Sequence, residues 1–145
     1  MMSEVLGPEE QQEIVHEVGG ELVSAAPAGW RWLQLSFRST IGVDTATFLC
    51  ADESGERRRV VPPVRAMRLL KRLRGGMYAE GAGAWFTATV TVEPPGRYRV
   101  EYDYDSEPVF IPPLRGSAYA LDLEHFPRAE GRIPEWLKRK LAVEA

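Results

Sequence analysis

The stretch Trp85–Asp105, WFTATVTVEPPGRYRVEYDYD, decides the fold of this 145-residue chain. Over Trp85–Glu93, apolar residues and alanine alternate with threonines, which is the period of a half-buried strand. Over Arg97–Asp105, tyrosines and a valine alternate with charged residues. The dipeptide Pro95-Gly96 suits the centre of a type II turn between the two halves. The stretch therefore predicts a β-hairpin.

Three more strands and a helix are expected before the hairpin. Alternation over Trp30–Arg38 and Thr45–Ala51 predicts two strands, and a short basic strand follows over Arg57–Val61. Val64–Arg74 has apolar residues at helical spacing, and Gly75-Gly76 suits the C-terminal cap of this helix.

The remaining segments predict helices at both ends of the chain. One runs from about Pro8 to Ser24, another over Ser117–Phe126 with Ser117 as its N-cap, and the last begins near Pro134. The order of elements predicts an α+β fold. It is an antiparallel β-meander of about five strands with an N-terminal helix, a helix inserted after the third strand, and C-terminal helices. We expect residues 1–145 to form a single domain.

The composition is that of an ordinary globular protein, with 44% hydrophobic and 27% charged residues. The only cysteine, Cys50, excludes an intramolecular disulfide and a thiolate zinc cluster. Apolar runs are too short for a membrane span, and the acidic N-terminus is unlike a signal peptide. We therefore expect a cytoplasmic protein that does not bind membranes.

The net charge of −3 conceals strong segregation along the chain. Residues 1–56 sum to −8, residues 57–74 to +8, residues 75–127 to −5 and residues 128–145 to +2. Such blocks either pair with one another in the fold or steer a charged protein partner. Because the whole chain has no basic excess, direct nucleic-acid binding is not expected.

Three acids at alternate positions, Asp103, Asp105 and Glu107, invite a metal hypothesis. The spacing resembles the start of an EF-hand loop, but Pro108 stands where that loop needs glycine and Leu114 where it needs glutamate. The alternatives that remain are a loose Mg²⁺ site, a solvated strand exit and a protein-contact patch. We expect no resident metal and no cofactor.

No catalytic site is predicted. Ser117, Asp122 and a histidine could be drawn as a triad, but no nucleophile-elbow context supports it. The alternative functions that stay open are a small-molecule-binding or regulatory domain and an uncharacterised enzyme. The first needs an apolar pocket lined by the strand that carries Tyr102 and Tyr104, and the second needs convergent carboxylates with shifted pKa values.

The run Met77–Pro108 resembles the core of the YezG-like immunity (antitoxin) proteins of bacterial polymorphic toxin systems. Pro27–Trp30, Leu73–Tyr78, Phe126–Arg128 and Ile133–Trp136 extend the resemblance in the same order along the chain. The arginine-rich residues 57–74 depart from the family pattern. The resemblance implies a small α+β protein that is not an enzyme and that neutralises a cognate secreted or contact-delivered toxin, either a nuclease or an NAD-degrading enzyme.

The predicted partner is therefore the cognate toxin domain, bound so that its active site is occluded. Acids mixed with aromatic residues are typical of protein interfaces and would meet a basic toxin groove. The hairpin and its exit concentrate such residues. The predicted partner-binding residues are Trp85, Glu101, Asp103, Tyr104, Asp105 and Glu107.

Overall fold

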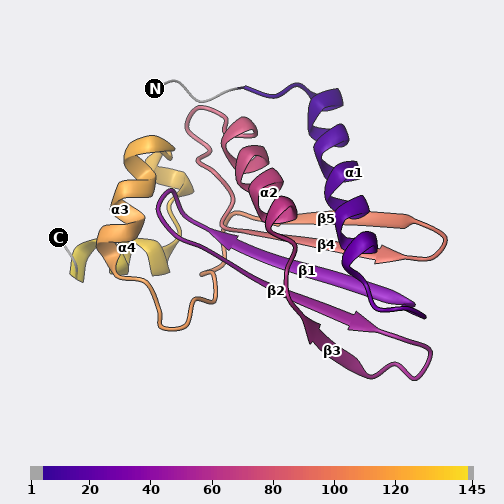
Figure 1. Ribbon diagram of the computed structural model, residues 1–145. Coiled ribbons are helices and arrows are strands. Elements are labelled where there is room, and N and C mark those ends of the chain that lie inside the picture. Colours follow the sequence, from indigo (N-terminus) through magenta and orange to yellow (C-terminus); the bar gives the residue numbers. More distant parts are fainter. Residues whose placement is uncertain (1–4, 144–145) are drawn as a thin grey trace.

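The computed structural model describes residues 5–143 and confirms the predicted fold class. One five-stranded antiparallel sheet has the strand order β3-β2-β1-β4-β5 (Figure 1). Within the described residues, no helix has the length and apolar character needed to cross a membrane. The elements are α1 (Pro8–Ala25), β1 (Trp32–Ser39), β2 (Asp44–Ala51), β3 (Arg57–Val60), α2 (Val64–Gly76), β4 (Thr87–Glu93), β5 (Arg97–Asp103), α3 (Gly116–His125), the 3-10 turn η1 (Glu130–Arg132) and α4 (Glu135–Val143).

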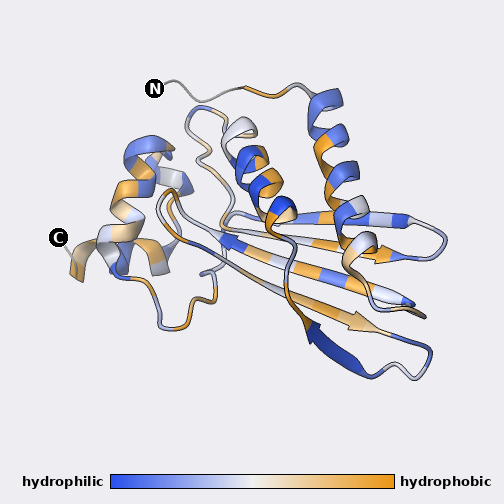
Figure 2. Cartoon of the chain, viewed as in Figure 1, coloured by the Kyte–Doolittle hydropathy of each residue, from blue (hydrophilic) through white to orange (hydrophobic). Residues whose placement is uncertain are grey.

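Helices α1 and α2 lie side by side over one face of the sheet and enclose the main core (Figures 1 and 2). The core strand β1 shows the predicted alternation, with every second residue buried. Leu35 lies between Phe48 of β2 and Val90 of β4, and all three are almost fully buried. Cys50 belongs to this core, and burial raises the pKa of its thiol. The alternating apolar residues therefore build one continuous core under the two helices.

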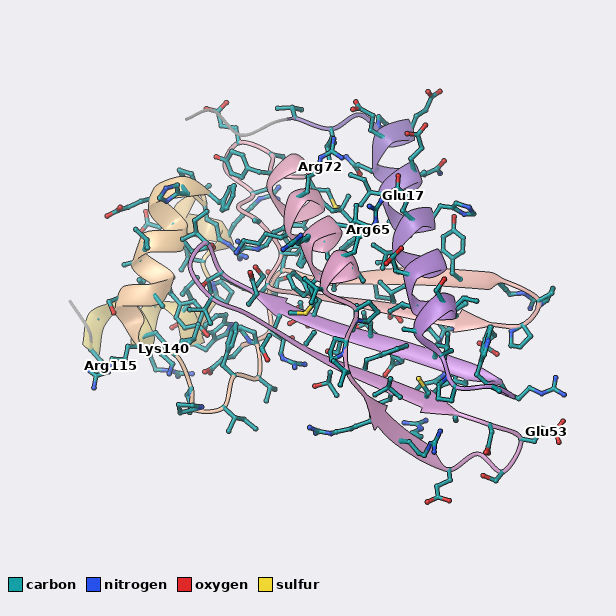
Figure 3. The ribbon with its side chains drawn as sticks, in the orientation of Figure 1. Glu17, Glu53, Arg65, Arg72, Arg115 and Lys140 are labelled. Carbon is teal, nitrogen blue, oxygen red and sulfur yellow. The ribbon has the colours of Figure 1, made fainter. Side chains whose placement is uncertain are left out.

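The first helix begins at Pro8 as predicted and continues through two glycines to Ala25. Its acidic flank faces the basic flank of α2. Arg65 Nη2 lies 2.8 Å from Glu17 Oε2, and Arg65 Nε lies 3.7 Å from Glu21 Oε2 (Figure 3). The expectation that the charge blocks pair within the fold is confirmed for Arg65.

The predicted glycine cap of α2 is wrong. Gly75 and Gly76 are both helical, and Met77 at the C-cap keeps right-handed helical dihedrals. Gly76 is needed for space, because a Cβ atom there would overlap the side chain of Leu6. The glycine thus lets the segment before α1 pack closely against the end of α2, where Leu6 N–H donates to the Gly76 carbonyl at 3.0 Å.

Helices α3 and α4 pack against each other at one end of the sheet (Figure 1). Phe86, Tyr119 and Leu137 form a second buried cluster there. Phe86 meets the Tyr119 ring edge-on, with ring centroids 5.6 Å apart. Ser117 is not the N-cap of α3, as was predicted, because the helix begins one residue earlier and Arg115 occupies the cap position.

The turn of the hairpin also differs from the prediction. Gly96 N–H donates to the Glu93 carbonyl at 3.0 Å, so Pro94 and Pro95 occupy the central positions. The Pro94–Pro95 peptide bond is cis, which defines a type VI turn rather than type II. The strands pair as predicted on either side of it, with Glu93 opposite Arg97.

Candidate partner-binding surface

The face of the sheet opposite α1 and α2, here termed the open face, presents side chains from all five strands. The antiparallel register sets residues of adjacent strands in rows, such as Gln34 beside Thr91 and Thr91 beside Arg99. Most of these side chains are polar. The members of the open face are Trp32, Gln34, Ser36, Arg38, Thr45, Thr47, Leu49, Ala51, Arg57, Arg59, Thr87, Thr89, Thr91, Glu93, Arg97, Arg99, Glu101 and Asp103.

The half of the open face formed by β1, β2 and β3 is basic. The Arg57 guanidinium lies 4.4 Å from the centre of the Trp32 ring, in cation–π geometry. Arg38 donates to the hydroxyl oxygens of Ser36 and Thr47, each at 2.9 Å. Burial lowers the pKa of Arg38 from its ordinary value, although the group stays a cation at neutral pH. These arginines are therefore held in place by their neighbours.

The other half, on β5, carries charges of both signs: Arg97 and Arg99 lie beside the acids that the sequence singled out, and Arg99 Nε lies 3.8 Å from Glu101 Oε1. Glu101 is exposed and Asp103 is half-buried, and both belong to the open face. Asp103 Oδ1 accepts the backbone N–H groups of Asp105 at 3.0 Å and Ser106 at 2.9 Å. The hydrogen bond from Ser106 lowers the pKa of Asp103, so its carboxylate is charged at neutral pH. Asp103 thereby fixes the direction in which the chain leaves the sheet.

Asp105 and Glu107 lie on the segment that follows Asp103 at the end of β5, here termed the exit segment, beside the C-terminal helices. The indole N–H of Trp136 donates to the Asp105 carbonyl at 2.6 Å, which leaves the Asp105 carboxylate exposed. Glu107 Oε2 lies 3.7 Å from Lys140 Nζ. In residues 5–143, no three acidic, histidine or cysteine side chains are arranged to hold a metal ion. The acids near the hairpin therefore form a strip rather than a metal cage.

The predicted surface role of Trp85 is wrong. Trp85 is 0% exposed, and its ring packs against Phe37 and Tyr102 in the main core. The reason is a β-bulge: Phe86 N–H donates to the Asp103 carbonyl, although the register opposes Asp103 to Thr87. The extra residue reverses the alternation, so Trp85 turns toward the main core and Phe86 toward the second cluster.

Tyr104 is also set apart from the acids that flank it. It is half-buried and packs against the main core, and burial raises the pKa of its phenol. Alternate residues of an extended chain point to opposite sides, which separates Tyr104 from Asp103 and Asp105. Of the six predicted residues, the structure therefore leaves Glu101, Asp103, Asp105 and Glu107 as candidates for contact with a partner.

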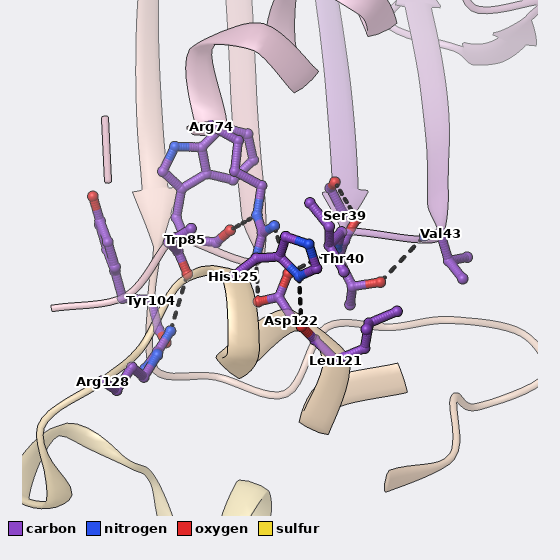
Figure 4. Close-up of polar contacts among 12 residues, drawn as sticks. Ser39, Thr40, Val43, Arg74, Trp85, Tyr104, Leu121, Asp122, His125 and Arg128 are labelled. Carbon is purple, nitrogen blue, oxygen red and sulfur yellow. Dashed lines mark hydrogen bonds and ion pairs between the residues drawn. The ribbon is translucent and has the colours of Figure 1, made fainter. Parts of the chain in front are cut away.

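Sequence reasoning missed a buried ion pair between α2 and α3. Arg74 and Asp122 are each about 1% exposed. Arg74 Nη1 donates to Asp122 Oδ1 and Arg74 Nη2 to Asp122 Oδ2, each at 2.7 Å (Figure 4). Arg74 Nε also donates to the Trp85 carbonyl, and Asp122 Oδ1 accepts the N–H of Ile41 at 2.7 Å. Both charges are paired and hydrogen-bonded, as buried charges require. Because these bonds link α3 to α2, the pair sets the position of α3.

A second arginine, Arg128, ties the segment after α3 to the hairpin. It donates to the carbonyl oxygens of Ala84 at 3.1 Å and Tyr104 at 2.7 Å, and it lies 4.9 Å from the centre of the Phe86 ring. Gly83 has a positive φ of 73°, and a Cβ atom there would crowd Arg128. Gly83 thus allows the turn before the hairpin and makes room for this arginine.

Two cavities bear on the ligand-binding alternative. One of about 500 Å³ lies between the exit segment and the C-terminal region and is lined by Tyr104, Asp105 and Arg128 among others. Another of about 480 Å³ lies between α1 and β5, where Val15, Tyr98 and Tyr102 are among the lining residues. The ligand-binding alternative requires an apolar pocket lined by the strand of Tyr102 and Tyr104; the second cavity lies beside Tyr102, but Tyr104 does not line it and its lining includes Gln11, Gln12 and Arg99.

No protein-family model matches the chain, and the comparison with curated proteins finds no match.

Proposed function

We propose that this protein is a non-catalytic immunity protein of the cytoplasm. It binds a cognate secreted or contact-delivered toxin domain, a nuclease or an NAD-degrading enzyme, and occludes the active site of that toxin. The proposal rests on the resemblance of Met77–Pro108 and the flanking motifs to YezG-like immunity proteins, together with the charged surface that the hairpin presents.

The observation that carries the proposal is the acidic strip formed by Glu101, Asp103, Asp105 and Glu107. It starts on a rigid sheet, and its side chains are exposed or half-buried. Asp103 and Trp136 hold the backbone of the exit segment, so the chain that carries Asp105 and Glu107 has a defined path before any partner binds. Preorganised charges of one sign increase the association rate and the selectivity for a basic partner groove.

The test is co-expression with the product of the neighbouring upstream gene, followed by co-purification and a growth assay. We expect a stable complex and rescue of growth from the C-terminal domain of that neighbour. The variant Glu101→Ala/Asp105→Ala should lose more than about 2 kcal/mol of binding free energy if the strip lies at the centre of the interface.

The matched control is Glu9→Ala/Glu10→Ala, which removes two exposed acids from the first turn of α1. This control should bind as tightly as the wild type. Normal binding by both double variants would reject the acidic strip as the interface but keep the function. The absence of any complex and of any toxicity would reject the immunity function itself.

A small-molecule-binding role is the second candidate, favoured by the cavity between α1 and β5. The Tyr102 phenol lines this cavity, and burial raises its pKa to about 12, so it remains neutral and available as a hydrogen-bond donor. Thermal stabilisation by one compound of a metabolite library would support this role. Such stabilisation should be weakened by Tyr102→Phe.

A further inference from the structure

Strand β5 forms one of the two edges of the sheet. Only β4 pairs with it within the described residues, so one side of its backbone has no strand partner. An edge strand with unpaired N–H and C=O groups is a template for another extended chain. At seven residues, β5 is long enough for several such hydrogen bonds.

The hydrogen-bonding pattern shows which residues of β5 face outward. Ser39 N–H donates to the Phe86 carbonyl, and the β1–β4 register continues in step from that bond. The backbone groups of the even-numbered residues of β4 therefore hydrogen-bond to β1, and those of the odd-numbered residues hydrogen-bond to β5. By the same alternation, the backbone groups of Tyr98, Val100 and Tyr102 point away from the sheet.

The sequence of β5 is complementary to itself when read in reverse. Its seven residues, RYRVEYD, have two arginines before the central Val100 and two acids after it. Pairing two copies antiparallel about Val100 brings Arg99 opposite Glu101 and Arg97 opposite Asp103. The same register brings Tyr98 opposite Tyr102, and it does so twice because of the two-fold symmetry.

We propose that β5 is a dimerisation edge that pairs with β5 of a second copy, in the register centred on Val100. The two sheets then form one continuous antiparallel sheet, and the open faces of the two copies join. Tyr98, Val100 and Tyr102 make the backbone hydrogen bonds of this interface. The four ion pairs fall at positions without such bonds, where facing side chains are closest in an antiparallel ladder.

The flank of α1 above β5 is compatible with a second copy beside it. His16 packs on the Tyr98 ring at 5.9 Å between centroids, and a Cβ atom at Gly19 would lie 3.9 Å from that ring. Gln12 and Val23 lie on the same helical stripe. These four stripe residues include no Asp, Glu, Lys or Arg, whereas Glu17 and Glu21 of α1 face α2.

The other edge of the sheet lacks these features. Strand β3 has four residues, and three of them are exposed arginines. Antiparallel pairing of β3 with itself would place like charges opposite one another, which is unfavourable. Only β5 therefore combines sufficient length with charge complementarity, and this dimer does not depend on the identity of any toxin.

Two single substitutions test the proposal by exchanging one charge each. In a dimer of Arg99→Glu, the new glutamate faces Glu101 of the second copy. In a dimer of Glu101→Arg, the new arginine faces Arg99 of the second copy. Arg99 and Glu101 are exposed, so both variants should fold normally. Sedimentation over a concentration series should show a dimer for the wild type and, for each variant alone, a dimer dissociation constant raised about tenfold or more.

An equimolar mixture of the two variants should restore the dimer, because each glutamate then meets an arginine. Hydrogen exchange provides a second readout: the Val100 amide should be protected in the wild type and in the mixture but not in either variant alone. Arg57→Glu on β3 is the matched control and should dimerise as the wild type does. A monomeric wild type, or dimers that persist in both single variants, would overturn the proposal.

Discussion

The two pairs of helices are attached to the sheet by different chemistry. Helices α1 and α2 cover the sheet through an apolar interface that includes Val18, Leu22 and Leu70, all fully buried. Helix α3 is also joined to α2 by the buried pair of Arg74 and Asp122. An apolar interface tolerates small shifts, whereas a bidentate ion pair fixes both position and angle. The main core therefore gives stability, and the ion pair gives α3 a defined place.

The largest expected effect comes from Arg74→Ala. This substitution leaves Asp122 buried without its countercharge, and breaking one partner of a buried pair costs about 3–5 kcal/mol. The free energy of unfolding from urea titration measures the loss. Amide hydrogen exchange should become faster in α3 and at the Ile41 amide, which donates to Asp122.

The matched control is Arg65→Ala, which removes the exposed ion pairs between α1 and α2. Surface pairs contribute up to about 1 kcal/mol, so this variant should remain close to the wild type. If Arg74→Ala cost no more than Arg65→Ala, the ion pair would not be what holds α3, and the contrast between the two attachments would disappear.

Two neighbouring glycines of α2 give a medium effect with opposite signs. A Cβ atom at Gly76 would overlap Leu6, and overpacking costs about 1–3 kcal/mol. At Gly75 such an atom would lie 3.9 Å from Phe126 Cζ, an ordinary contact. Gly75→Ala should therefore raise the melting temperature through better helix propensity, and Gly76→Ala should lower it. A rise in both variants would show that the segment containing Leu6 packs loosely.

The regular elements were predictable because alternation and helical spacing report directly on burial. Strands β1, β2, β4 and β5 and the position of α2 follow from such patterns, and the start of α1 follows from Pro8, which suits the first turn of a helix. The cap at Gly75-Gly76 was not predictable, because glycine suits both a left-handed cap and a close approach. Only the packing of Leu6 shows which of the two applies.

The candidate site was predictable only in part, for two physical reasons. Strand alternation correctly placed Glu101 and Asp103 on one face, but a bulge at Phe86 reversed the alternation and buried Trp85. A bulge adds one residue without a distinct sequence signal. The partners Arg74 and Asp122 lie far apart in the chain, and each alone resembles an ordinary surface charge on a helix.

The smallest expected effect lies at Asp103, where the hairpin joins the segment leading to α3. Hydrogen bonds from the backbone, above all from Ser106, lower the pKa of this carboxyl in the folded protein. The charged form therefore contributes stability that is present above the unfolded pKa of about 4 and is lost as the pH falls through the folded pKa. Asp103→Asn keeps an acceptor oxygen but not the charge, so it should cost under about 1 kcal/mol at neutral pH. Urea titrations at several pH values should show this cost shrinking in acid, and a cost independent of pH would mean that the charge of Asp103 does not stabilise the turn.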